Sequence, residues 1–141
     1  MKTNGIMFTA KVYKICIASA GGALQEVHIA QDKVAKWNCQ RGEECGAVFL
    51  QVSKDASPDV YVFVIDNYVD KAIVESAIET GNTVFLFFSS YHDQNNTMGC
   101  EIQAIKTFRG MINAKCSCLD YDTVMSFEAD LIKQLENYLT A

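Results

Sequence analysis

DVYVFVIDNYVDKAIVESAIETGNTVFLFFSS, residues 59–90, decides the fold of this chain. Residues 60–65 are apolar at every position and residues 83–88 form a second apolar run, which is typical of strands covered on both faces. Between them, Asp70 suits the N-terminal cap of a short helix, and Gly81 suits its end. Strand, helix and strand in this order predict a parallel sheet with helices on its faces.

The same alternation of strand and helix patterns continues along the rest of the chain. We predict further strands at residues 12–19, 47–52 and 114–121, and helices at residues 23–40, 102–112 and 124–139. The strand at 114–121 alternates between polar and apolar residues, as an edge strand does.

These elements predict a single domain, residues 1–141, of the α/β class. The expected architecture is a flavodoxin-like three-layer sandwich around a central, mainly parallel five-stranded sheet, in the order 2-1-3-4-5. The link between the second and third strands is too short for the usual crossover helix. It is therefore either an extended strap, or the second strand lies elsewhere.

Composition and charge narrow the classes of partner. The net charge is −5 and there is no run of Lys or Arg, which argues against binding nucleic acid or an anionic membrane. Lys11 and Lys14 interrupt the apolar stretch near the N-terminus, so we expect no signal peptide. No apolar run approaches the roughly 20 residues that span a bilayer. We therefore expect a cytoplasmic protein without a membrane or nucleic-acid partner.

The cysteines give no metal-binding pattern. Six cysteines occur without a CxxC pair, and only two histidines accompany them. A zinc site therefore has little support, and we predict no metal and reduced thiols. The cysteines are Cys16, Cys39, Cys45, Cys100, Cys116 and Cys118.

A ligand is expected beyond the carboxyl ends of the strands, where ligands bind in open parallel sheets. Residues 18–22 are small and precede a helix, so their loop is either a tight turn or a phosphate contact. Ser89 follows the fourth strand and suits either a phosphate or the cap of a turn. His92 lies in the same loop and is a candidate ligand contact.

Glu75 is the conspicuous acid of the helix after the third strand. It flanks the apolar face of that helix, and Glu79 follows one turn later. Two acids at this spacing usually mark a solvated face. The alternative is a carboxylate that takes part in chemistry.

Several segments resemble bacterial TIR-like domains. YKICIASAGGALQEVHIAQDKVAKWN resembles their opening, a strand ending in Ser-Ser, a short loop, and a Glu-Arg pair at the start of a long helix. VESAIETGNTVFLFFSS resembles their glutamate-containing helix, the glycine turn and the next strand, and residues 104–139 resemble their last strand and helix. Val27 stands where the family has arginine, and segments 53–59 and 66–70 are shorter than in the family.

The resemblance implies recognition, and possible cleavage at the N-glycosidic bond, of NAD or a related nucleotide in bacterial or phage-defence signalling. Glu75 would then be the catalytic carboxylate, stabilising an oxocarbenium-like ribose. NAD would be substrate or ligand, with no other cofactor. Ser19, Gly21 and Gly22 would lie near the phosphate or ribose, and Asp66 and Tyr68 would contact the ribose or base. Ser89 and His92, candidates from their position in the sequence, would add further contacts. The alternative is a non-catalytic module that forms a homo-oligomer or docks on a larger signalling partner.

Overall fold

A five-stranded parallel sheet forms the centre of the protein, in the order β2-β1-β3-β4-β5. The computed structural model describes residues 8–89 and 99–141. The predicted α/β, flavodoxin-like fold and its strand order are thus confirmed. The strands are β1 (Lys11–Gly21), β2 (Ala47–Gln51), β3 (Val60–Ile65), β4 (Thr83–Ser89) and β5 (Ser117–Tyr121).

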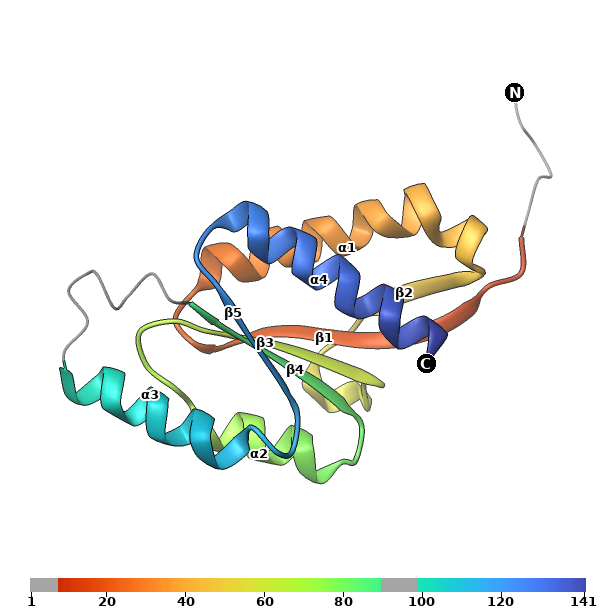
Figure 1. Ribbon diagram of the computed structural model, residues 1–141. Helices are drawn as coiled ribbons and strands as arrows, with labels where there is room; N and C mark the ends of the chain where they lie inside the picture. The colour runs from red at the N-terminus through yellow and green to blue at the C-terminus, as the bar shows by residue number, and fades with distance from the viewer. Residues whose placement is uncertain (1–7, 90–98) are drawn as a thin grey trace.

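Helices cover both faces of the sheet, which gives the three layers (Figure 1). On one face lie α1 (Leu24–Cys45) and α4 (Val124–Thr140). On the other lie α2 (Lys71–Glu79) and α3 (Gly99–Ile112). A short 3-10 turn, η1 (Lys54–Ala56), connects β2 to β3.

β3 is the centre of the core, and all six of its side chains are buried. They alternate between two apolar clusters, because successive side chains of a strand point to opposite faces. Val60, Val62 and Val64 pack on the side of α1 and α4, and Tyr61, Phe63 and Ile65 pack on the side of α2. Each fully buried apolar side chain of this kind contributes roughly 1.5–3 kcal/mol.

α1 runs further than the sequence predicts, since the expected end near residue 40 is wrong. The helix continues to Cys45 and ends at Gly46, whose φ of 65° places it in the left-handed region. Gly42 is retained within the helix because a Cβ there would lie 3.0 Å from the carbonyl oxygen of Ala47. Gly42 thus allows α1 to pack closely on the start of β2.

β1 pairs with two different strands along its length. Its first half pairs with β2 and its second half with β3, so that Ile15 lies opposite both Gln51 and Val60. The chain therefore leaves β2 at the level where β3 begins, and residues 52–59 need only cross β1. The crossing is fixed by Asp59, whose N–H donates to the carbonyl of Lys14 at 2.8 Å. Of the two alternatives for this link, the structure shows a strap across β1, with the 3-10 turn η1 within it, and the stagger explains its length.

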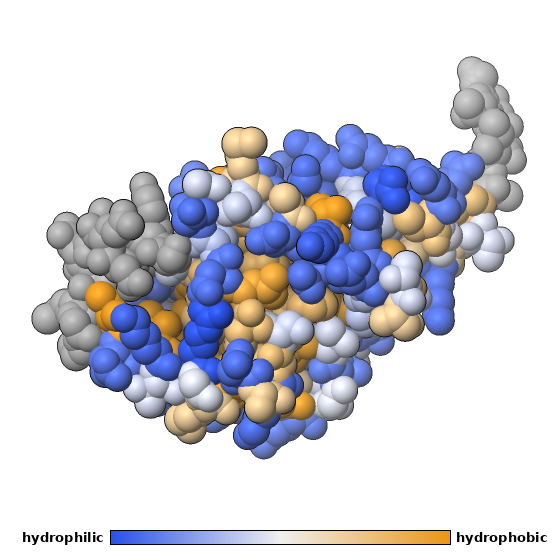
Figure 2. Space-filling model, in the orientation of Figure 1, coloured by the Kyte–Doolittle hydropathy of each residue, from blue (hydrophilic) through white to orange (hydrophobic). Residues whose placement is uncertain are grey.

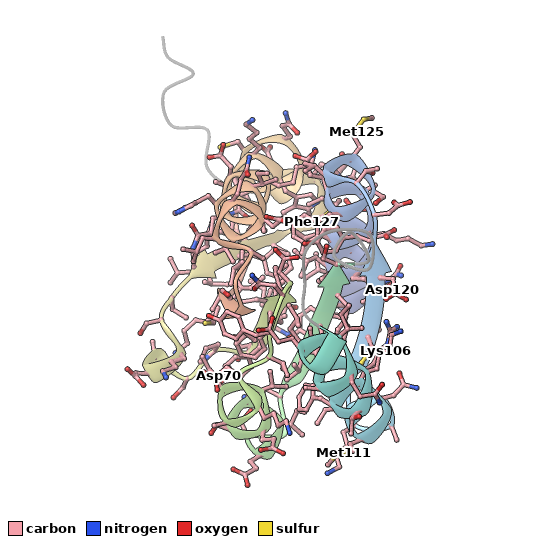
Figure 3. All side chains as sticks on the ribbon, turned by 90° about the vertical axis from the view of Figure 1, so that its left-hand side faces the viewer. Asp70, Lys106, Met111, Asp120, Met125 and Phe127 are labelled. Atoms are coloured by element: carbon pink, nitrogen blue, oxygen red, sulfur yellow. The ribbon has the colours of Figure 1, made fainter. Side chains whose placement is uncertain are left out.

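The short crossover leaves part of the sheet without a helix. Val12 and Leu50 lie on the face of α2, on neighbouring strands, and are 56% and 51% exposed. Figure 3 shows α1 and α4 side by side on one face, whereas on the other face only η1 lies beside β2. The start of β1 and the end of β2 therefore present apolar side chains to solvent.

The opposite edge of the sheet, β5, carries charge. Arg109 of α3 pairs with Asp120 of β5, and its guanidinium lies 4.8 Å from the centre of the Phe88 ring. Figure 2 shows this face of the molecule, where apolar side chains gather between α4 and α3 and polar side chains cross them. A charged pair on an edge strand discourages pairing with another strand.

Candidate functional site

The end of β1 forms a turn in which the hydroxyl of Ser19 is already used. Its Oγ donates to the carbonyl of Gly22 and accepts from the N–H of Gly21 at 3.0 Å. The pairing of β1 with β3 shifts register between Ser19 and Gly21. Ser19 therefore shapes this turn, whatever further contact it makes.

Gly21 and Gly22 allow the end of β1 to pack against the loop that follows β3. A Cβ on Gly21 would lie 1.6 Å from the carbonyl oxygen of Tyr68, and one on Gly22 would lie 2.5 Å from Oδ1 of Asn67. The N–H of Asp66 donates to the carbonyl of Gly21 at 2.8 Å. At these two positions the fold itself requires glycine, because no side chain fits between the two loops.

Asp66 and Tyr68 face different surroundings. Asp66 is half-buried and lies close enough to Tyr121 to raise the pKa of its phenol. Tyr68 is 53% exposed. The two side chains that the resemblance assigns to the ribose or base are therefore not equivalent, and of the two only Asp66 contributes to the electrostatics around Tyr121.

Tyr121, the last residue of β5, is the centre of a polar cluster at the carboxyl edge. It is 5% exposed, and its hydroxyl donates to Oε2 of Glu26 at 2.9 Å. Burial raises the pKa of Tyr121, the hydrogen bond and the charge of Glu26 raise it further, and a hydrogen bond with Ser89 acts in the opposite direction. The phenol therefore stays protonated and holds the carboxylate of Glu26 in place.

A pocket of about 350 Å³ opens beside this cluster. Its lining combines the first turns of α1 and α4 with the ends of β4 and β5. The lining residues are Gln25, Glu26, Ser89, Tyr121, Asp122, Thr123 and Val124. The first turn of α4 is held by a capping box, in which Thr123 and Ser126 bond each other's backbone N–H groups. The pocket thus lies where the fold class places ligands.

Glu75 lies elsewhere. It is exposed on α2 and lines a separate pocket of about 290 Å³ with Ile78, Glu79, Ile112 and Lys115. That pocket lies between α2 and the end of α3. The structure does not bring Glu75 together with Ser89 or Glu26 in one pocket.

Another groove, of about 440 Å³, follows from the short crossover. It lies between η1 and α2, over the side chains of Tyr61 and Phe63, and its rim includes Lys54, Asp55 and Asp70. Asp70 caps α2 by accepting from the N–H of Ile73, and Figure 3 shows it at the start of that helix. None of the residues that the sequence assigns to a nucleotide lines this groove.

The remaining expectations concern His92, metals and membranes. His92 lies outside the described residues. Across residues 8–89 and 99–141, no group of three His, Cys, Asp or Glu side chains is placed to hold a metal ion. No helix within the described part of the chain is both long enough and apolar enough to cross a membrane.

Comparison with known proteins does not assign this chain to a family. No protein-family model and no curated protein sequence matches the chain. The relation to TIR-like domains therefore stays a resemblance of residue pattern, joined by the flavodoxin-like fold.

Sequence reasoning missed the pair formed by Glu26 and Tyr121. The two residues are 95 positions apart, so no local pattern links them. The available signals were weak. Glu26 lies in the first turn of a predicted helix, and Tyr121 lies at the carboxyl end of a predicted strand, immediately before the cap of the last helix.

Proposed function

We propose that this domain binds the nucleoside part of NAD or of a related nucleotide in the pocket at the carboxyl edge of its sheet. One observation carries the proposal. The carboxylate of Glu26, held by Tyr121, and the hydroxyl side chains of Ser89 and Thr123 line one pocket. Carboxylates and hydroxyls are the partners that ribose hydroxyls and base edges need.

The size of the pocket supports a nucleoside rather than a whole dinucleotide. About 350 Å³ lies at the lower end of the roughly 300–1,000 Å³ range of small-molecule sites. One base and one ribose match this volume. The rest of NAD would extend beyond the lining residues.

The same pocket bears on glycosidic cleavage, the chemistry that the resemblance implies. A carboxylate that stabilises an oxocarbenium-like ribose must lie beside the sugar. Glu26 lines the pocket and Glu75 does not. In this proposal the catalytic carboxylate, for any cleavage that the domain performs, is Glu26 rather than Glu75.

Calorimetric titration with nicotinamide riboside, adenosine and NAD tests the proposal, with nicotinamide release followed in parallel. We expect Glu26→Gln to weaken binding by about tenfold or more, since a charged hydrogen-bond partner contributes roughly 1.5–3 kcal/mol. Glu75→Gln should bind as the wild type does. Glu43→Gln, the same change at the far end of α1, is the matched control. Absence of binding of all three compounds to the wild type contradicts the proposal.

A second candidate function, that of an interaction module, is favoured by the uncovered face of β1 and β2. Val12 and Leu50 lie there on neighbouring strands, two residues apart in register, and are more than half exposed. Light scattering over a range of concentrations tests self-association through this face. A mass that rises with concentration in the wild type, but not in Leu50→Ser, supports it, and a constant monomer mass contradicts it.

A further inference from the structure

The carboxyl-edge pocket is surrounded by negative charge. Glu26 and Asp122 line it directly, and Asp66 lies close enough to act on Tyr121. No Lys or Arg is among the described residues that line it. A ligand entering this pocket therefore meets carboxylates before it meets any compensating side-chain cation.

The two helices that begin at the pocket do not reverse this field. The first N–H groups of α1 and α4 each correspond to roughly half a positive charge. Glu26 already lies in the first turn of α1 and offsets that charge, and the capping box of Thr123 and Ser126 satisfies the start of α4. The two carboxylates in the lining, Glu26 and Asp122, outweigh two half charges and leave the pocket negative, so an incoming phosphate is repelled.

We infer that the pocket selects nucleosides without a 5′-phosphate, uncharged or cationic, over the corresponding nucleotides, so that free nucleosides bind more tightly than NAD, whose two riboses both carry a 5′-phosphate. The inference rests on the proposed function and names its ligand class. Ribose hydroxyls donate to carboxylates, and a pyridinium ribonucleoside adds a positive charge that carboxylates attract. A phosphate, which only accepts hydrogen bonds near neutral pH, finds no Lys or Arg among the lining residues that the structure describes.

Two matched pairs of ligands test the inference by titration at low salt. Nicotinamide riboside is compared with nicotinamide mononucleotide, and adenosine with adenosine monophosphate. In each pair only the 5′-phosphate differs. We expect the phosphate to weaken binding by about tenfold or more, and the difference to shrink at high salt because screening weakens the repulsion.

Charge-neutralising variants show whether the carboxylates cause the selection. Asp122→Asn should raise the affinity for the mononucleotide relative to the riboside, whereas Glu43→Gln, remote from the pocket, should leave the ratio unchanged. Tighter or equal binding of the mononucleotide by the wild type overturns the inference while the proposed function stands. Binding of neither member of either pair overturns the inference, and absence of NAD binding as well overturns the proposed function.

Discussion

The side-chain amide of Asn38, on α1, closes the outer edge of β2 by bonding the backbone of Phe49. Its Nδ2 donates to the carbonyl of Phe49 and its Oδ1 accepts from the N–H, each at 2.9 Å. Gly46 and Val52, three residues to either side, bond to β1 instead. Successive residues of a strand direct their backbone hydrogen bonds to opposite sides, so the N–H and carbonyl of Phe49 face away from β1. Asn38 thus takes the positions that a further strand would occupy.

Replacement of Asn38 by alanine should destabilise the protein and expose this edge. The N–H and carbonyl of Phe49 lose their partner, which costs about 1–3 kcal/mol in the free energy of unfolding. β2 carries no charged residue to discourage pairing with a second copy. We therefore also expect a mass that rises with concentration, measured by light scattering beside urea unfolding.

Gln51→Ala is the control for this variant. Gln51 also joins β2 to α1, by donating to the carbonyl of Gln31 at 2.8 Å, but this bond is exposed. Its loss should change neither the unfolding free energy nor the mass appreciably. Wild-type stability and mass in Asn38→Ala would show that the amide does not guard the edge.

Gly21→Ala should be strongly destabilising, since its Cβ would lie 1.6 Å from the carbonyl oxygen of Tyr68. Backbone atoms must move to relieve that overlap, and we expect a loss of about 3 kcal/mol or more. Gly110→Ala in α3 is the matched control, because no atom lies within 4 Å of its added Cβ. Alanine there should stabilise the helix by roughly 0.5–1 kcal/mol. Thermal unfolding that ranks the two variants equally would contradict this account of the β1 turn.

Alkaline pH should weaken the fold through Cys116. Burial, and then the neighbouring thiol of Cys118, raise the pKa of Cys116 to about 12, above the value near 9 of an unfolded chain. The folded protein holds this proton more tightly, so the stabilisation is complete below about pH 9 and is lost as the pH rises toward 12. Urea unfolding between pH 8 and 11 should show a falling free energy, with a smaller slope in Cys116→Ala. An unchanged slope in Cys116→Ala, with Ser117→Ala as reference, would contradict the assignment.

Trp37→Phe should lower the free energy of unfolding more than the loss of Arg41, although both residues contact the carboxylate of Glu136. Trp37 is 4% exposed and its Nε1 donates to Oε2 of Glu136 at 2.8 Å, which joins α1 to α4. Loss of this bond and of part of the ring should lower the unfolding free energy by about 1–3 kcal/mol. Arg41, which pairs with the same oxygen from the surface, should matter less in Arg41→Gln. The reverse order, measured by chemical denaturation, would mean that the surface ion pair holds the two helices.

The central position of β3 and β4 follows from sequence, because the apolar runs at residues 60–65 and 83–88 require cover on both faces, and the strand order then follows from the fold class. The stagger of β1 does not. The stagger depends on the full length of β1, from Lys11 to Gly21, which exceeds the predicted 12–19. The added residues, Lys11, Ala20 and Gly21, have no strand pattern in the sequence. The end of α1 was missed for a related reason. Gly42 serves a contact with Ala47, and such contacts between elements leave no local pattern.

The candidate site was only half accessible to sequence reasoning. The ends of β1, β3 and β4 lie at the carboxyl edge as predicted, because the position of strand ends follows from the fold. The structure ties Ser19, Gly21 and Gly22 to the packing of the turn, and the cluster around Tyr121 forms from residues distant in the chain. Glu75 is conspicuous in the sequence of its helix. The helix pattern alone, however, does not show which pocket the side chain of Glu75 lines.

The passage from β2 to β3 also has a consequence for engineering. Residues 52–59 make the crossing with a single 3-10 turn, and Ser53, Lys54, Asp55, Ala56 and Ser57 are exposed. Extra residues inserted there meet no packed neighbour, and longer surface loops cost little entropy. An amphipathic helix grafted at this point has a ready-made apolar seat in Val12 and Leu50. The short crossover between β2 and β3 is thus a suitable site for an insertion.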